Sequence, residues 1–149
     1  MAWATFLAVF LLVGVGGMVR ATGAGLGCPD WPKCWGCWLP PSGPGEIESF
    51  TDGAGKKFFK DKQGSVHPIS EFDSKKMWIE YLNRMIGVVI GLMITVTFML
   101  SIRLRKKDVF LFGCSLSALA LVMIQGWLGA VVVQSGLQPG IITLHMLLA

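Results

Sequence analysis

Charged residues are scarce in this chain of 149 residues, since Asp, Glu, Lys and Arg together make up 15% of it. An ordinary soluble domain has about 25% charged residues and about 45–50% apolar ones; here the hydrophobic share is 53%. So much apolar content excludes a disordered chain. The net charge of +4 is modest and the charges are segregated along the chain, which argues against nucleic acid as a partner. We therefore expect a membrane protein, with the lipid bilayer as its surroundings.

Signatures of common soluble enzymes are also missing. The sequence contains no Walker loop, dinucleotide-binding fingerprint, zinc-protease motif or nucleophile elbow. No internal repeat of convincing length occurs. Histidine is present only twice, as His67 and His145. Candidate chemistry must therefore come from the few polar residues that lie near or within the apolar segments.

Long stretches without charge predict membrane-spanning helices, because a bilayer core needs about 20 apolar residues per helix. Charges are absent from residues 3–19, 86–102 and 109–142. We predict helices over 2–19, 79–101 and 109–133, and the start of a fourth over 140–149. The fold class is then an all-α membrane protein, a transmembrane four-helix bundle with three complete helices and the start of a fourth, with residues 1–149 forming one unit.

The two ends of the chain lead to two further expectations. The first helix has no basic residue before it, so we expect a retained span rather than a signal peptide. The last segment, opened by Pro139 in its first turn, has about ten residues and would reach about halfway across a bilayer. We therefore expect the sequence to be a fragment of a longer protein.

Basic residues set the expected orientation. Four of them lie in the short turn 102–108, which predicts a cytoplasmic turn. Segment 20–77 carries both signs of charge and three cysteines, a combination that favours the oxidising outer side. Within it, residues 42–76 form a polar insertion, which we interpret as a loop with a short helical piece.

This topology brings several polar side chains to the outer end of the bundle. Glu80, Asn83 and Arg84 share one face of the second helix. His145 lies on the second turn of the fourth, and Gln125 lies in the outward half of the third. An intramembrane histidine suits heme ligation, a proton relay or a structural hydrogen bond. Glu80 is explained either by the helix dipole or by a polar site that faces the histidine.

Cysteines and glycines each leave alternatives open. Cys28 and Cys34 can close a small loop as a stapling disulfide or as an exchangeable dithiol, and Cys37 could compete for either partner. A zinc site is disfavoured because no histidine or fourth cysteine has the right spacing, and Cys114 is expected to be a packing residue. His67 is expected to be solvated.

Small-residue spacings favour close helix packing, although a flat cofactor would also need them. These spacings involve Gly14, Gly16, Gly17, Gly87, Gly91, Gly126 and Gly129.

Four segments resemble the heme A synthase family. Residues 16–36 resemble its first helix and first outer loop, 78–84 its second-helix motif, and 125–133 with 137–149 its third helix and the start of its fourth. The resemblance implies eight transmembrane helices in two similar halves, of which this chain resembles the first. It also implies oxidation of a methyl group of heme O, through two hydroxylations and loss of water, to the formyl group of heme A. The hydroxyl oxygen would come from water or dioxygen.

The resemblance also assigns roles to particular residues. His145 matches the heme-iron ligand of the fourth helix, Glu80 the catalytic glutamate, and Cys28 with Cys34 the outer-loop disulfide pair. Asn83 departs from the family, since many members carry histidine there as a second ligand. Asparagine is a poor ligand for heme iron, so the resemblance with this change implies an open axial position near Glu80.

Arg84 and Arg20 are predicted, by charge and depth, to bind heme propionates. The resemblance implies heme O and heme A as substrate and product in this half and heme b in the other. It further implies a bacterial plasma membrane, with loop 20–77 periplasmic. Heme O synthase, terminal oxidase assembly factors and a second copy of the chain are the expected partners. Two alternatives are a membrane thiol–quinone oxidoreductase that uses the cysteine pair and a non-catalytic heme-binding assembly subunit. Residues 1–149 alone are expected to be inactive.

Overall fold

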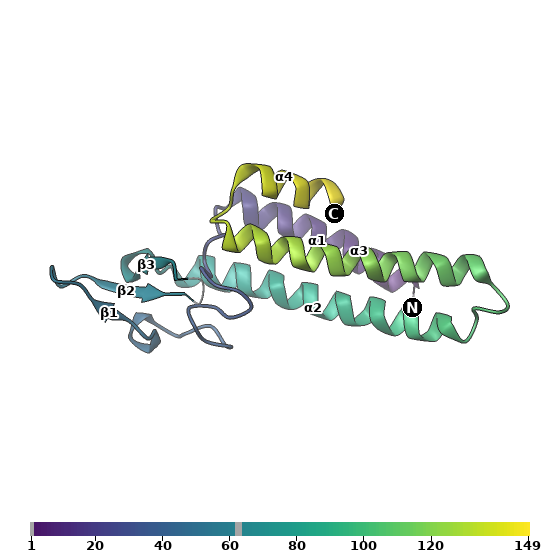
Figure 1. Cartoon of the computed structure of the whole chain (residues 1–149), viewed down its shortest axis with the longest axis horizontal. Helices are drawn as coiled ribbons and strands as arrows, with labels where there is room; N and C mark the ends of the chain where they lie inside the picture. Colours follow the sequence, from purple (N-terminus) through teal and green to yellow (C-terminus); the bar gives the residue numbers. More distant parts are fainter. Residues whose placement is uncertain (1, 62–63) are drawn as a thin grey trace.

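Four helices form most of the protein in a computed structural model, which describes residues 2–61 and 64–149 (Figure 1). They are α1 (Ala2–Ala21), α2 (Ser74–Ile102), α3 (Val109–Gln134) and α4 (Pro139–Leu148). The first three are long and apolar enough to cross a membrane, with mean hydropathies of 1.9, 2.4 and 2.1. The prediction of a largely helical membrane fold is confirmed.

Capping residues explain where the helices begin. α2 begins at Ser74 instead of residue 79, because the Asp73 carboxylate accepts the backbone N–H groups of Lys75 and Lys76 at 2.9 and 3.2 Å. The sequence prediction placed this start too late, since the two lysines lower the local hydropathy. α3 begins at residue 109 as predicted, where Asp108 accepts the Leu111 N–H at 2.8 Å.

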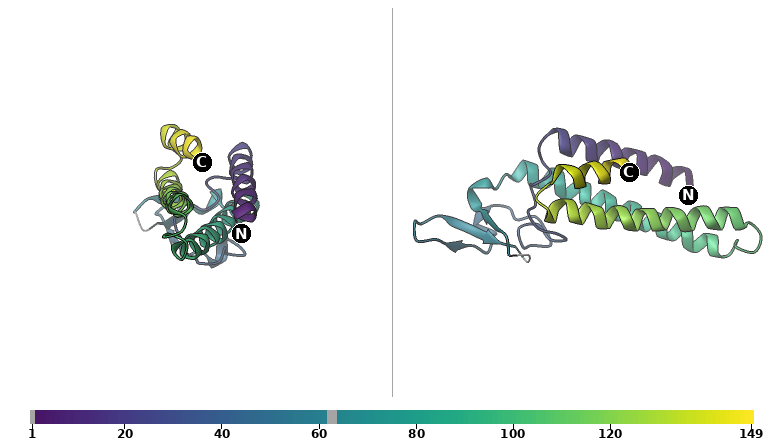
Figure 2. Two further views of the ribbon diagram at one scale, coloured as in Figure 1. Left: turned by 90° about the vertical axis from the view of Figure 1, so that its right-hand side faces the viewer. Right: turned by 45° about the horizontal axis from the view of Figure 1, so that its top comes forward.

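The helices pack in chain order. α2 lies against both α1 and α3, and α3 lies against α4. Figure 2 shows this series along the helix axes, with α1 and α4 at its two ends. Between α2 and α3 the hydroxyls of Ser101 and Ser115 lie 2.5 Å apart, and the rings of Phe98 and Phe112 lie 5.9 Å apart.

The long loop between α1 and α2 contains a small antiparallel sheet. Strand β2 (Lys57–Lys60) pairs with β1 (Phe50–Thr51) on one side and with β3 (Val66–Pro68) on the other. Short 3-10 turns at Pro44–Glu46 and Ile69–Glu71 flank the sheet. The prediction of a loop with a short helical piece missed these strands, because each is too short to show a recognisable alternation of apolar and polar residues.

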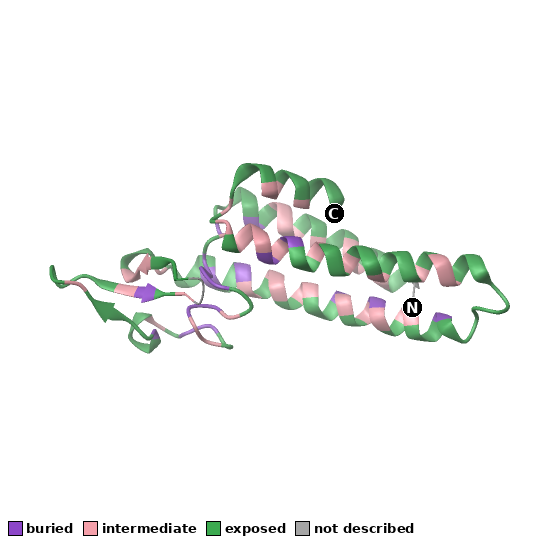
Figure 3. Ribbon diagram, viewed as in Figure 1, coloured by how far each residue is buried: buried purple, intermediate pink, exposed green. Residues whose placement is uncertain are grey.

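The buried core lies where this loop meets the start of α2 (Figure 3). By contrast, only 6% of the apolar window of α1 and 17% of those of α2 and α3 are buried. The helices therefore present mostly exposed apolar surface, and the tightest packing is at the outer-loop junction. The core cluster consists of Cys28, Cys34, Trp35, Ile47, Phe59 and Met77.

Three smaller predictions fail within this chain. Close helix packing at the glycines is wrong for most of them within the described residues, because no side chain or other helix comes within 4 Å of an added Cβ there. Cys114 is exposed on α3 and does not pack between helices. The His67 ring is half-buried, with its Nε2 3.3 Å from the Asp61 carboxylate, so it is not simply solvated. The glycines at which an added Cβ would meet nothing within 4 Å include Gly14, Gly16, Gly17, Gly87, Gly91 and Gly126.

Candidate functional site

Glu80 and Arg84 form an ion pair one turn apart near the start of α2. The two side chains are 5% and 13% exposed, so the pair is largely withdrawn from solvent. The second carboxylate oxygen of Glu80 accepts the backbone N–H of Cys28 at 2.9 Å. Both oxygens of this predicted catalytic carboxylate are therefore held by protein donors, which fix its position.

Arg84 connects α2 to the outer loop through backbone carbonyls. Its Nη1 donates to the carbonyl oxygens of Asp30 and Lys33 at 2.8 and 3.0 Å. Its Nη2 donates to the Cys28 carbonyl at 3.0 Å and to Glu80. A guanidinium group presents its donors in a rigid fork, which suits the binding of several oxygens at once. Arg84 thus holds the turn of residues 28–33 against the helix.

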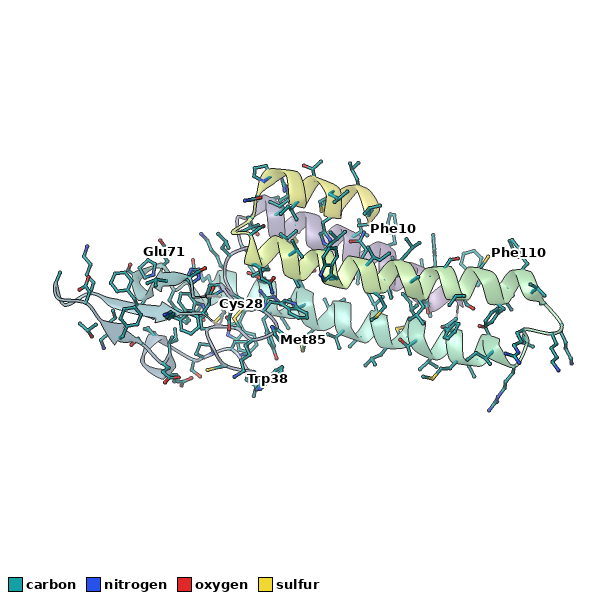
Figure 4. All side chains as sticks on the ribbon, in the orientation of Figure 1. Phe10, Cys28, Trp38, Glu71, Met85 and Phe110 are labelled. Carbon is teal, nitrogen blue, oxygen red and sulfur yellow. A yellow bond between two sulfur atoms is a disulfide. The ribbon has the colours of Figure 1, made fainter. Side chains whose placement is uncertain are left out.

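A disulfide joins Cys28, the first residue of this turn, to Cys34, which directly follows it, with their Cα atoms 4.7 Å apart. Figure 4 shows Cys28 at the junction of the loop with α2. The backbone before it lies directly on the helix, since a Cβ on Gly27 would come within 2.4 Å of the Lys76 carbonyl carbon. The Trp35 indole also donates to the Gly27 carbonyl at 2.8 Å. Only glycine fits this close approach.

A second polar cluster lies between α3 and α4. The Gln125 side chain donates to the His145 carbonyl at 3.3 Å, and a Cβ on Gly129 would lie 3.6 Å from Cε1 of the imidazole. Within the described residues the imidazole makes no hydrogen bond, and its Nδ1 is enclosed without a partner. Nε2 is not among the buried polar atoms without a partner, so it is the ring nitrogen left open to a ligand. The side-chain oxygen of Gln125 is also buried and has no partner among the described residues.

Asn83 and Arg20 lie apart from these contacts. The Asn83 side-chain oxygen is buried and has no hydrogen-bond partner in the described part of the chain. Arg20 is exposed on the last turn of α1. A buried amide oxygen without a partner is costly, so Asn83 offers an acceptor to any group that reaches it.

The predicted site residues lie on α1, the outer loop, α2 and α4 (Figure 1), and their contacts join most of them into two sets. Glu80, Arg84 and the two disulfide cysteines form one set, and His145 belongs to the other. Sequence reasoning missed Gly27 and the loop carbonyls that bind Arg84. Backbone carbonyls leave no mark in a sequence, although the i, i+4 spacing of Glu80 and Arg84 was visible.

The chemistry available to these residues is limited and specific. No group of three or more His, Cys, Asp and Glu side chains that could hold a metal ion occurs among residues 2–61 and 64–149. A bare metal ion would find too few ligands here. The accessible imidazole nitrogen of His145 instead fits a metal that arrives with other ligands already bound, as iron does in a porphyrin.

Comparisons with known proteins agree with this picture. Residues 1–149 match the model of a family described as cytochrome oxidase assembly protein. A heme A synthase of Shewanella oneidensis is 26% identical over 147 residues, which cover 96% of this chain and 38% of that protein. Those of Orientia tsutsugamushi and Flavobacterium johnsoniae are 31% and 32% identical over 132 residues each, covering 89% and 87% of this chain.

The chain spans well under half of the length of these curated relatives, namely 38%, 36% and 38%. No solved structure matches it. The family match nevertheless extends over every residue of the sequence and agrees with the resemblance to heme A synthases carried by its motifs. This chain belongs to the cytochrome oxidase assembly protein family.

Proposed function

We propose that this chain binds heme O and takes part in the oxidation of one methyl group to the formyl group of heme A. Membership of the cytochrome oxidase assembly family and similarity to heme A synthases support heme A formation as the process. The observation that carries the proposal is the His145 imidazole, which makes no hydrogen bond within the described residues and keeps Nε2 accessible. A membrane-depth imidazole in this state suits axial ligation of heme iron.

The surroundings of His145 fit a flat ligand. Gly129 lies next to the imidazole of His145, and Gly126, about one turn earlier on α3, is open because a Cβ there would meet nothing within 4 Å. A planar macrocycle can approach helix backbone closely where side chains are absent. The side-chain amide of Gln125 donates to the backbone carbonyl of His145, and its own oxygen is a buried acceptor without a partner among the described residues. Heme O would be the substrate and heme A the product held there.

Glu80 is the proposed catalytic carboxylate. Its negative charge would stabilise positive charge that develops on the substrate methyl carbon, or it would accept a proton from that carbon. Support comes from its fixed position, because the Cys28 amide and Arg84 each hold one oxygen.

Arg84 acts in this account as a positioning residue, since both of its terminal nitrogens already donate to protein oxygens. Exposed Arg20 is the better candidate to bind a heme propionate.

Asn83 is the position at which this chain would differ from relatives that hold the heme iron with two histidine ligands. With His145 as the one protein nitrogen on the iron, the opposite axial position of bound heme would stay open to a reactant. Because an amide is a poor ligand for heme iron, the buried Asn83 oxygen would instead accept a hydrogen bond from a polar group of the bound molecule. In this account heme b, which relays electrons, would belong to a second half of the complete protein.

The proposed setting is a bacterial plasma membrane with the loop of residues 20–77 in the periplasm and the basic turn 102–108 in the cytoplasm. The exposed apolar surface of the helices supports contacts with lipid, with further helices or with a second copy. Heme O synthase and terminal oxidase assembly factors are the proposed protein partners, since the substrate must arrive from one and the product must leave to the other.

Pigment extraction tests this function. The protein is purified from bacterial membranes that make heme O, and its bound pigments are identified by chromatography and mass spectrometry. We expect heme O, together with heme A where the complete protein is present. Bound quinone without heme would contradict the proposal and favour a thiol–quinone oxidoreductase. Heme b alone would contradict it in favour of a non-catalytic heme-binding assembly subunit.

A further inference from the structure

The third outer-loop cysteine, Cys37, is paired through its backbone with Cys34. The N–H of each residue donates to the carbonyl of the other, at 2.9 and 3.1 Å. Between them, Trp35 and Gly36 have φ values of 53° and 80°. Two consecutive residues with positive φ define a type I′ turn, the standard two-residue hairpin connection. Cys34 and Cys37 therefore face each other across a hairpin.

This arrangement places Cys34 within reach of two partners. Directly opposed residues in a hydrogen-bonded antiparallel pair have Cα atoms about 5.5 Å apart and side chains on the same face. Disulfides form between Cα atoms about 4.4–6.8 Å apart. The existing partner, Cys28, has its Cα 4.7 Å from that of Cys34. A disulfide also needs Cβ atoms about 3.5–4.5 Å apart, whereas those of opposed residues lie about 4.5–5.5 Å apart. The Cys34 sulfur can thus bond to Cys37 once the two sides of the hairpin approach by about 1 Å.

Burial differs sharply between the three cysteines. Cys28 and Cys34 are both 0% exposed, whereas Cys37 is half-buried and carries a free thiol. An external thiol cannot reach a completely buried disulfide, because exchange requires direct attack on one of its sulfurs. Cys37 is the one thiol of this loop that is both next to Cys34 and open to the solvent.

We propose that Cys37 attacks Cys34 and moves the disulfide from Cys28–Cys34 to Cys34–Cys37. The Cys37 thiolate forms the new sulfur–sulfur bond while the Cys28–Cys34 bond breaks, and Cys28 leaves as a thiolate. The proton lost by Cys37 ends on Cys28, so the exchange is an isomerisation without net oxidation. The loop stays docked during exchange, because Glu80 and Arg84 bind the backbone of Cys28 and not its sulfur.

The exchanged disulfide contains half-buried Cys37, so a partner can reach one of its sulfurs, whereas both sulfurs of the Cys28–Cys34 disulfide belong to fully buried residues. An external dithiol can then reduce the exchanged disulfide through a mixed disulfide with Cys37. The dithiol gives up two electrons and two protons and becomes a disulfide, while Cys34 and Cys37 become thiols. The loop thus becomes a thiol–disulfide exchange site for a dithiol protein or small dithiol. This inference goes beyond heme oxidation and does not depend on it.

Peptide mapping tests the exchange in the intact protein. Trypsin cuts after Arg20, Lys33 and Lys56, which separates peptide 21–33, holding Cys28, from peptide 34–56, holding Cys34 and Cys37. The protein is held at about pH 8.5, near the ordinary thiol pKa, without oxidant or reductant, and free thiols are then alkylated before digestion. We expect a fraction of peptide 21–33 to be unlinked and alkylated, with an internal disulfide in peptide 34–56.

Two variants complete the test. Cys37→Ser must keep the two peptides linked, while Cys114→Ser, which removes the other free thiol, must behave as the unmodified protein. Reduction of the loop disulfide by an external dithiol is expected to be about tenfold slower in Cys37→Ser than in Cys114→Ser. Complete linkage of the peptides in the unmodified protein would overturn the proposal, as would equal reduction rates in the two variants.

Discussion

At the scale of single residues, Gly27 has the least room for a side chain. A Cβ there would lie 2.4 Å from the Lys76 carbonyl carbon and 2.5 Å from the Met77 nitrogen, both backbone atoms of α2. Gly27→Ala should therefore force the loop away from the helix and lower the free energy of unfolding by about 1–3 kcal/mol or more. Thermal unfolding in detergent, followed by tryptophan fluorescence, measures the change.

Gly43→Ala is the matched control, since a Cβ at Gly43 would meet nothing within 4 Å. Its unfolding temperature should stay within error of the unmodified protein. If Gly27→Ala were as stable as this control, the close contact between loop and helix would be wrong.

Asn83 carries the prediction about iron coordination. With His145 as the one protein nitrogen on the iron, heme bound to the unmodified chain should give a high-spin electron paramagnetic resonance signal. Asn83→His supplies a second imidazole and should convert that signal to the low-spin form typical of two histidine ligands. Asn83→Gln, which keeps an amide, should leave the signal high-spin. A low-spin signal with two histidine ligands from the unmodified chain would contradict the open axial position.

The candidate site could be predicted only partly at this scale. Glu80, Arg84 and His145 were identifiable because polar residues at membrane depth are rare and have few roles. Which partners Arg84 binds could not be predicted, since its acceptors are backbone carbonyls whose positions depend on the folded loop. The pairing of Cys28 with Cys34 followed from the resemblance alone, because spacing left Cys37 as a competitor.

At the scale of elements, the attachment of the outer loop to α2 depends on Arg84. Its guanidinium donates to the carbonyl oxygens of residues 28, 30 and 33 and pairs with buried Glu80. Arg84→Ala removes these bonds and leaves the carboxylate unpaired, a change that typically costs about 3–5 kcal/mol. The loop should open more often, and trypsin should cut the folded protein after Lys33 about tenfold faster or more.

Arg103→Ala is the control for Arg84→Ala, because it removes the same charge from the exposed turn at the far end of α2. Cleavage after Lys33 in that variant should match the unmodified protein. Equal cleavage rates in Arg84→Ala and Arg103→Ala would show that the guanidinium does not hold the loop.

Elements differed in how far the sequence could predict them. The three long helices were predictable because uncharged runs of their length have few other structures. The start of α2 was placed too late, since hydropathy does not register the cap formed by Asp73. The three strands escaped prediction because they contain only two to four residues each and are stabilised by contacts such as that of Phe59 with Trp35, at 5.6 Å between rings.

At the scale of the whole molecule, the outer loop packs tightly against the start of α2, whereas α1, α2 and α3 bury little of their apolar surface. The core lies between the outer loop and the first turns of α2, which also hold the Glu80–Arg84 ion pair (Figure 3). At most of the helix glycines an added Cβ would meet no neighbour within 4 Å. The chain also covers only 36–38% of the three relatives compared. Both observations fit a bundle surface that meets lipid or further protein. The sequence pattern predicted the spans, but not how loosely the helices pack.

The central claim, that His145 binds the iron of heme O, can be measured by titrating purified protein with heme O and following the Soret absorbance. The unmodified protein should bind one heme per chain, and His145→Ala should weaken binding by about tenfold or more. His67→Ala, which removes the other histidine of the chain, should bind as the unmodified protein does. Equal affinity and equal spectra for His145→Ala and the unmodified protein would contradict the account.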